Sequence, residues 1–161
     1  MAKAEKTNVM RLLDSRKIPY TIHYYGDTDA VSGTDVAAVL GESPEKVFKT
    51  LVTVGRTKQH YVFIIPVEKE LDLKKAANAA GEKSIEMIKS KELLPLTGYI
   101  HGGCSPVGMK KQFPTFMDKS AEQKQTWEAL LSEAQRAGPM VFLRERFYNM
   151  HILYVGDVFC V

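Results

Sequence analysis

The stretch "VFKTLVTVGRTKQHYVFIIPV", Val47–Val67, decides the fold of this 161-residue chain. Both ends are nearly continuously apolar and rich in β-branched residues, which is typical of strands buried on both faces. Between them "GRTKQH" combines a glycine with polar residues, as a hairpin loop requires. The stretch therefore predicts two neighbouring central strands, at 47–54 and 61–66, joined by a hairpin.

The segments on either side of this hairpin alternate between helix and strand patterns. In chain order we expect a helix within 6–17, a strand within 20–25, a helix over 32–41 that restarts at Pro44, a helix from Asp72 to Gly81, and a short strand followed by a helical turn ending at Pro95. The alternation predicts an α/β or α+β fold with a mixed sheet flanked by helices.

Bulk composition bounds the class of protein. The chain is 45% apolar and 25% charged, with a formal charge of +3, which suits one soluble domain and gives only weak support for a nucleic-acid partner. No apolar run approaches the roughly 18 residues of a membrane span, and the charged N-terminus lacks the core of a signal peptide. We therefore expect a cytoplasmic protein whose two cysteines, Cys104 and Cys160, are reduced.

Lys49 is the one charged residue inside the apolar part of the first predicted strand. Burying an ammonium group without a partner is costly, and lysine is rarely fully buried unless it is paired. Three interpretations stay open: the side chain reaches solvent, it pairs with a buried carboxylate, or it enters a cleft that binds an anion, ester or carbonyl group.

A glycine-rich loop, "HGGCSPVGMKK" at 101–111, is the other distinctive motif. It is not a phosphate-binding P-loop, because Met109 stands where that motif requires lysine. Cys104 with His101 as base is a weak nucleophile hypothesis, because a three-residue spacing in a loop fixes no Cys–His contact; Cys104 filling a small pocket is the favoured interpretation. One H-x-x-C pair without a second pair predicts no metal site.

The loop can also serve as a backbone site. Adjacent glycines let the main chain approach a ligand and turn N–H groups toward a carbonyl or a developing oxyanion. Ser105 adds a hydroxyl, Pro106 stiffens the exit, and Lys110 and Lys111 can meet phosphates at the rim. From the residues alone, this interpretation and a plain glycine-rich turn are equally supported.

Four motifs, "VFKTLV", "HYVFIIPV", "ELDLKKAA" and "TGYIHGGCSPVGMKKQFPTFMD", resemble the YbaK/EbsC family in order and spacing, over about residues 5–122. These proteins are free-standing relatives of the editing domain inserted in bacterial prolyl-tRNA synthetases, and the Cys-tRNA(Pro) deacylases are the most similar branch. The resemblance implies a mixed, barrel-like sheet flanked by helices, with neither metal nor organic cofactor.

The implied activity is hydrolysis of cysteine from mischarged tRNA(Pro), with prolyl-tRNA synthetase as a candidate partner and no membrane association. The resemblance implies that the thiol of the substrate cysteine attacks the ester, so the protein positions the ester and stabilises the oxyanion. Two alternatives stay open: a deacylase for another small amino acid such as alanine, and a non-catalytic or impaired module that binds tRNA or the aminoacyl end.

The resemblance also implies a set of site residues. Carried over position by position, the catalytic set is Lys49, Gly103 and Ser105, and the substrate-binding set is Tyr25, Thr50, Gly102 and Pro106. Lys49 would orient the aminoacyl end and its ester, while the loop backbone would bind the carbonyl. Tyr24 could replace Tyr25 if the register shifts by one. Cys104 falls on a position that varies in the family, so it is not a family nucleophile.

The last part of the chain departs from the family pattern. We expect one domain over 1–161, family-like to about 122, with a divergent tail at 123–161 that contains an amphipathic helix at 124–136 and further apolar strands or coil. The tail is either a natural replacement of the family's last strands or the product of a reading-frame shift. The sequence leaves both origins open.

Overall fold

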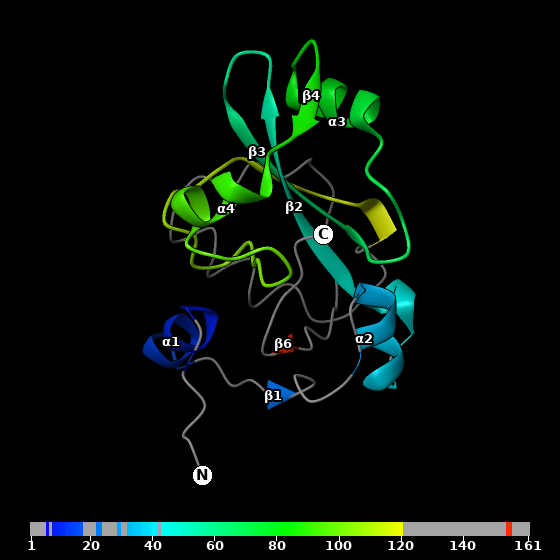
Figure 1. Cartoon of the computed structure of the whole chain (residues 1–161), viewed down its shortest axis with the longest axis vertical. Helices are drawn as coiled ribbons and strands as arrows, with labels where there is room; N and C mark the ends of the chain where they lie inside the picture. The colour runs from blue at the N-terminus through cyan, green and yellow to red at the C-terminus, as the bar shows by residue number, and fades with distance from the viewer. Residues whose placement is uncertain are drawn as a thin grey trace.

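The computed structural model describes residue 6, residues 8–17, 22–23, 29, 32–41, 43–120 and 154–155. Its elements in chain order are α1 (Asn8–Ser15), β1 (Ile22–His23), α2 (Gly33–Val39), the 3₁₀ turn η1 (Pro44–Lys46), β2 (Phe48–Gly55), β3 (His60–Pro66), α3 (Leu73–Ala80), β4 (Ile85–Met87), α4 (Ser90–Thr97), β5 (Thr115–Met117) and β6 (Tyr154–Val155). β2 and β3 run through the middle of the molecule, and the helices lie around them (Figure 1).

The predicted hairpin is the centre of the structure. β2 and β3 pair antiparallel from Phe48 opposite Pro66 to Val54 opposite His60. The turn is closed by the Gly55 N–H, which donates to the Gln59 carbonyl at 2.8 Å. The predicted strands are therefore confirmed, each to within one residue at its ends.

A mixed sheet forms around the hairpin, in the order β4-β2-β3-β5. β4 is antiparallel to β2, whereas β5 runs parallel to β3 and pairs Phe116 with Phe63. β1 and β6 form a separate two-stranded parallel sheet, with Ile22 opposite Tyr154. The expected mixed sheet flanked by helices is confirmed; the strands described in it make an open four-stranded sheet.

The two faces of the four-stranded sheet have separate cores, because successive side chains of a strand point to opposite sides. On one face α1, α4 and the 99–117 segment pack against β2 and β3, through Val9, Leu13, Val52, Val62, Ile64, Leu93, Tyr99, Cys104, Val107, Phe113 and Met117. On the other face α3 packs through Tyr61, Phe63, Ala76, Ala77, Ile85 and Phe116. We call them the loop face and the α3 face.

Local signals explain where the helices begin and end. The Ser32 side chain caps α2 by accepting from the Asp35 N–H, and Asp72 caps α3 by accepting from two backbone N–H groups. Gly81 ends α3 at φ +70°, a conformation that favours glycine. The helix predicted over 72–81 is thus confirmed.

Two local predictions were wrong. The restart at Pro44 is only a three-residue 3₁₀ turn, in which the Ser43 side chain makes no capping hydrogen bond. α4 does not end at Pro95 but continues to Thr97. Core packing of Leu93 and the Thr97 hydroxyl, which donates to the Leu93 carbonyl at 2.8 Å, hold the last turn in spite of the proline.

Several predictions lie outside the described residues. Of the strand expected within 20–25, only Ile22 and His23 are described, and the helix expected at 124–136 falls wholly outside. In the part of the chain that the structure describes, no helix has both the length and the hydropathy to cross a membrane.

Candidate functional site

Lys49 is buried in the central strand. Only 9% of its surface is exposed, and its backbone pairs with Ile65 across the β2–β3 ladder. Because Leu51 and Phe63 pair next along the ladder on the same side, strand alternation directs the Lys49 side chain to the α3 face. The interpretation that Lys49 simply reaches solvent is therefore wrong.

The Lys49 ammonium has no hydrogen bond and no ion pair to any described residue. Burial lowers its pKa, and the more distant carboxylate of Glu70 offsets this only in part. Pairing with a buried carboxylate is thus also excluded within the described chain. A buried cationic donor without a partner among the described residues fits a site that receives an anionic or carbonyl oxygen, because leaving such a donor unpaired is costly.

Thr50, the neighbour of Lys49, is 1% exposed and points the other way, toward the loop face. Val52, two residues further along, shares that face and packs in the same core cluster as Cys104. The two residues of the Lys-Thr pair therefore point to opposite faces of the strand. No hydrogen bond joins Lys49 to the glycine loop within the described structure.

The glycine loop begins with a tight turn at 100–103. The Gly103 N–H donates to the Ile100 carbonyl at 3.0 Å, and Gly102 has φ +86°. A four-residue turn with positive φ at its third position has the character of a type II turn, where glycine is strongly preferred. Space is open beside Gly102, since a Cβ atom there would meet nothing within 4 Å.

This turn decides which loop amides can meet a ligand. The Gly103 N–H is used inside the turn. The N–H groups of Gly102 and Cys104 make no hydrogen bond within the described structure. Because Cys104 is fully buried, the Gly102 N–H is the one of these two amides that could donate to a carbonyl or oxyanion.

Behind the turn, buried polar groups hold the loop in place. Ser105 is 1% exposed, and its Oγ accepts from the Val107 N–H at 3.1 Å. The Tyr99 hydroxyl donates to the Val107 carbonyl at 2.5 Å, and burial raises the pKa of Tyr99, so this phenol stays protonated. As placed here, Ser105 supports the loop backbone from inside.

Gly108 fits the same arrangement through close approach. Its φ is +75°, and a Cβ there would lie 3.2 Å from the Tyr99 hydroxyl. The role of Tyr99 was missed at the sequence level. The signal in the sequence was its place directly after Gly98 and before the loop, but the contact with Val107 depends on how the chain folds back.

Cys104 is fully buried, at 0% exposure, and packs in the core cluster of the loop face. This confirms the interpretation that it fills a small apolar pocket. A thiol in that position has no access to a substrate, so the nucleophile hypothesis loses its support.

Two predicted site residues remain, Pro106 and Tyr25. Pro106 lies half-buried in the loop between Ser105 and Val107. Tyr25 and its alternative, Tyr24, lie outside the described residues. Among the residues that are described, no group of three or more His, Cys, Asp or Glu side chains is arranged to hold a metal ion.

Comparison with known proteins supplies relatives of this chain. It is 45% identical over 140 residues to EbsC of Enterococcus faecalis (strain ATCC 700802 / V583), named as a candidate Cys-tRNA(Pro)/Cys-tRNA(Cys) deacylase; the match covers 86% of this chain and 84% of that protein. It is also 35% identical over 83 residues to a proline–tRNA ligase of Pelobacter propionicus (strain DSM 2379 / NBRC 103807 / OttBd1), covering 52% of this chain but only 14% of the ligase.

A solved structure has the same fold. The crystal structure of a candidate trans-editing enzyme for prolyl-tRNA synthetase superposes with a TM-score of 0.67 at 23% identity, covering 86% of this chain and 96% of that chain. The family model of the aminoacyl-tRNA editing domain matches residues 28–141, and so extends past residue 122 into the segment expected to be a divergent tail. The chain therefore belongs to the aminoacyl-tRNA editing domain family.

Proposed function

We propose that this chain is a trans-editing deacylase that removes cysteine from mischarged tRNA(Pro) in the cytoplasm. The observation that carries the proposal is the buried Lys49 side chain, whose ammonium group lacks a hydrogen-bonding partner among the described residues. Membership of the editing-domain family and the 45% identity to EbsC support the same reaction class.

The proposed chemistry needs no side-chain nucleophile. The thiol sulfur of the substrate cysteine forms a bond to the ester carbonyl carbon, and the bond from that carbon to the ribose oxygen breaks. The thiol proton passes to the ribose oxygen, so the products are free tRNA and a cyclic thiolactone that water opens. The aminoacyl ester is already activated, so positioning and oxyanion stabilisation suffice.

In this proposal Lys49 donates to the ester or to the adjacent ribose-phosphate end, and the glycine turn contributes through its backbone. The open space at Gly102 lets a ligand approach the main chain there. Ser105 and Thr50 are positioning residues, since both are at 1% exposure. Prolyl-tRNA synthetase is the proposed source of the mischarged tRNA, because part of a proline–tRNA ligase is similar in sequence to this chain.

The test is a deacylation assay with Cys-tRNA(Pro) and Ala-tRNA(Pro). We expect rapid loss of the cysteinyl ester, loss of most activity in Lys49→Ala and near-normal activity in Cys104→Ala. Faster hydrolysis of the alanyl ester would instead indicate a deacylase for Ala-tRNA(Pro), in which water attacks the ester. Intact esters with well-folded protein that still binds tRNA would favour the non-catalytic module.

A further inference from the structure

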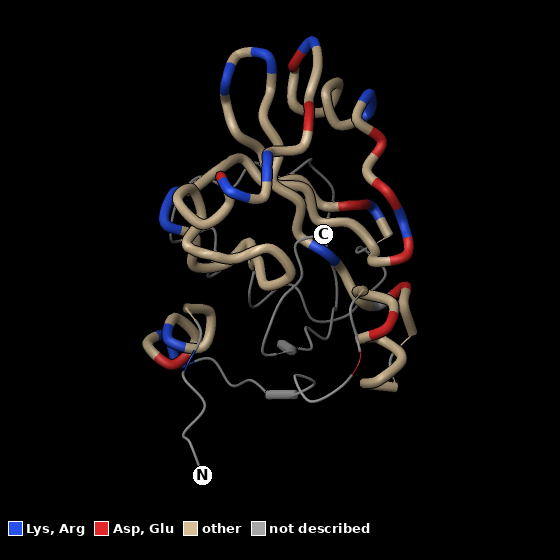
Figure 2. Tube along the Cα trace, viewed as in Figure 1, with Lys and Arg blue, Asp and Glu red and all other residues tan. Residues whose placement is uncertain are grey.

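Charge is unevenly distributed over the described surface (Figure 2). On one side, α1 with the residues that follow it and the 89–112 segment together carry seven cations: Arg11, Arg16, Lys17, Lys89, Lys91, Lys110 and Lys111. We call this set the basic face. The side formed by α2, η1 and the 66–72 loop carries mainly carboxylates: Asp35, Glu45, Glu68, Glu70 and Asp72.

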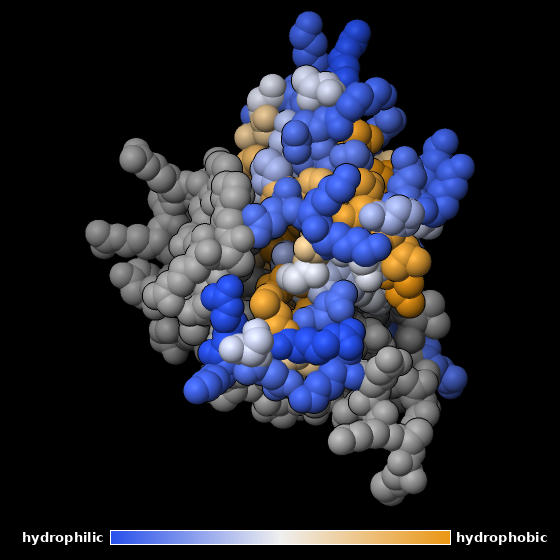
Figure 3. All heavy atoms as spheres, turned by 90° about the vertical axis from the view of Figure 1, so that its left-hand side faces the viewer, coloured by the Kyte–Doolittle hydropathy of each residue, from blue (hydrophilic) through white to orange (hydrophobic). Residues whose placement is uncertain are grey.

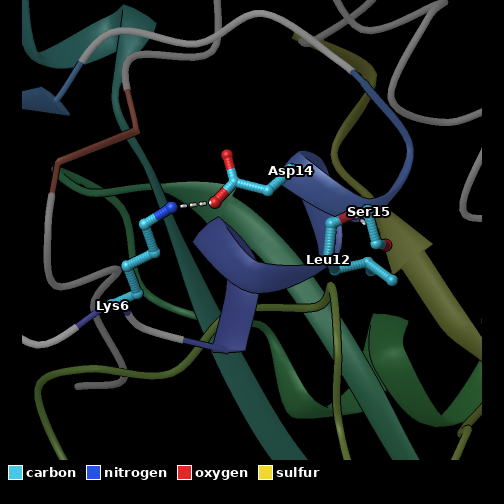
Figure 4. A network of polar contacts seen from close by, with 4 residues as sticks. All are labelled: Lys6, Leu12, Asp14 and Ser15. Atoms are coloured by element: carbon cyan, nitrogen blue, oxygen red, sulfur yellow. Dashed lines mark hydrogen bonds and ion pairs between the residues drawn. The ribbon is translucent and has the colours of Figure 1, made fainter.

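The two carboxylates within the basic face are already engaged. Asp14 on α1 forms an ion pair with Lys6 (Figure 4). Glu92 accepts a hydrogen bond from the Lys89 backbone N–H at 2.9 Å, at the start of α4. Two carboxylates against seven cations leave the face with a net positive charge, which attracts an anionic partner.

The basic face is continuous between α1 and α4. A Cβ at Gly98, just after α4, would lie 3.3 Å from Lys110 Cγ and 3.7 Å from Asn8 Nδ2. Arg11 donates to Asn8 Oδ1 at 3.0 Å. Arg11 and Lys110 therefore flank the same Asn8–Gly98 contact, although they are far apart in the sequence.

This face borders the glycine turn. Ile100, the first residue of the turn, is 64% exposed, and His101 beside it is also exposed. The described part of this side of the molecule is largely hydrophilic, with apolar atoms exposed among the charged side chains (Figure 3). A ligand lying along the lysines can thus reach the turn with its end.

We propose that the basic face binds the phosphate backbone of the tRNA acceptor stem and directs the aminoacyl end to the glycine turn. The inference rests on the proposed function, and it adds the surface that the RNA occupies. A-form RNA is recognised largely through phosphates and 2′-hydroxyls, and lysines and arginines that neutralise phosphates release counterions. The carboxylate-rich side repels the same backbone, so only one orientation of the stem is favourable.

The test compares two triple variants of equal charge. Lys91→Gln/Lys110→Gln/Lys111→Gln removes three exposed cations from the basic face, and Lys69→Gln/Lys74→Gln/Lys75→Gln removes three from the opposite side. Binding of uncharged tRNA(Pro) is measured by fluorescence anisotropy from 50 to 300 mM salt. Removing one lysine–phosphate interaction at 0.1 M salt weakens binding on the order of tenfold and lowers the salt slope by roughly 0.9.

We expect the first triple variant to weaken tRNA binding at least 30-fold with a shallower salt slope, and the second to stay within threefold of wild type. If both triple variants weakened tRNA binding equally, the effect would come from the net charge of the protein and not from one face, and the proposal would be overturned. Unchanged binding by the first would also overturn it.

A second measurement separates this inference from the proposed function. The cysteinyl ester of adenosine has no stem, so the first triple variant should hydrolyse it at the wild-type rate while its KM for Cys-tRNA(Pro) rises. If wild type hydrolyses neither ester but binds tRNA through the basic face, the proposed function fails and the docking surface stands. Equal loss on both esters would contradict the docking role.

Discussion

Replacing Lys49 by methionine should stabilise the protein while abolishing its deacylase activity. Methionine keeps an unbranched chain of similar length, so it fills the same space without the ammonium group. Only 9% of Lys49 is exposed, and no described residue pairs with it. Leaving a buried polar group unsatisfied costs about 1–3 kcal/mol. Because Glu70 offers partial long-range compensation, we take the lower end, a gain of about 1 kcal/mol.

That gain is measurable by thermal unfolding. Unfolding entropy is about 2.1 cal/mol/K per residue, so for 161 residues 1 kcal/mol corresponds to a rise in Tm of about 3 °C. Lys74→Met on the exposed side of α3 is the matched control and should change stability by less than about 0.5 kcal/mol. The deacylation rate of Lys49→Met should fall about 10²–10³-fold, the usual effect of losing one donor to a developing oxyanion.

The stability difference should also depend on pH. The pKa of Lys49 is 10.5 in the unfolded chain and lower in the folded protein. At pH values between these two pKa values, the unfolded chain holds a proton that the folded protein has lost. Wild-type stability therefore rises relative to Lys49→Met as pH increases through that window, and the full deficit is present below the folded pKa. A methionine variant that is less stable than wild type at pH 7, or one that retains deacylation, would refute the reasoning.

Three further predictions test the supports of the site. Gly102→Ala should cost about 1–2 kcal/mol of stability, because φ +86° strains any residue with a Cβ. The deacylation rate per folded molecule should also fall, which an assay corrected for the folded fraction would reveal. Cys104→Ala should lower stability by about 1 kcal/mol in urea unfolding yet keep the rate. Glu82→Gln should remove an acid-sensitive part of stability: hydrogen bonds from Thr57 and Tyr61 lower the pKa of Glu82, so wild type, but not the variant, loses that contribution as pH falls through the folded pKa below 4.5.

The hairpin could be predicted because its signal is local. β-branched residues over 47–54 and 61–66 specify strands, and the glycine and polar residues between them specify a turn. Helix caps such as Asp72 and Gly81 are equally local. By contrast, α4 continues past Pro95 because its core contacts outweigh the helix-breaking effect of the proline. Those contacts depend on which residues meet across the fold.

The candidate site was predictable only in part, for the same reason. The sequence singled out Lys49 and the glycine turn because a cation in an apolar strand and adjacent glycines are unusual in themselves. It could not place Tyr99 against Val107, nor assign the buried side of the loop to one face of the sheet. Those facts depend on the parallel pairing of β5 with β3, which closes a long connection.

The buried and open sides of the loop have different roles, and this affects how variants should be interpreted. Cys104, Ser105 and Val107 point into the core, and their contacts fix the path of the main chain. The open side of the turn is left to the backbone around Gly102. Substitutions of the buried side chains should therefore act mainly through stability, and substitutions that alter the turn backbone should act mainly through catalysis. The proposed mechanism without a side-chain nucleophile agrees with this division, because it assigns contact with the ester to the turn backbone and one lysine.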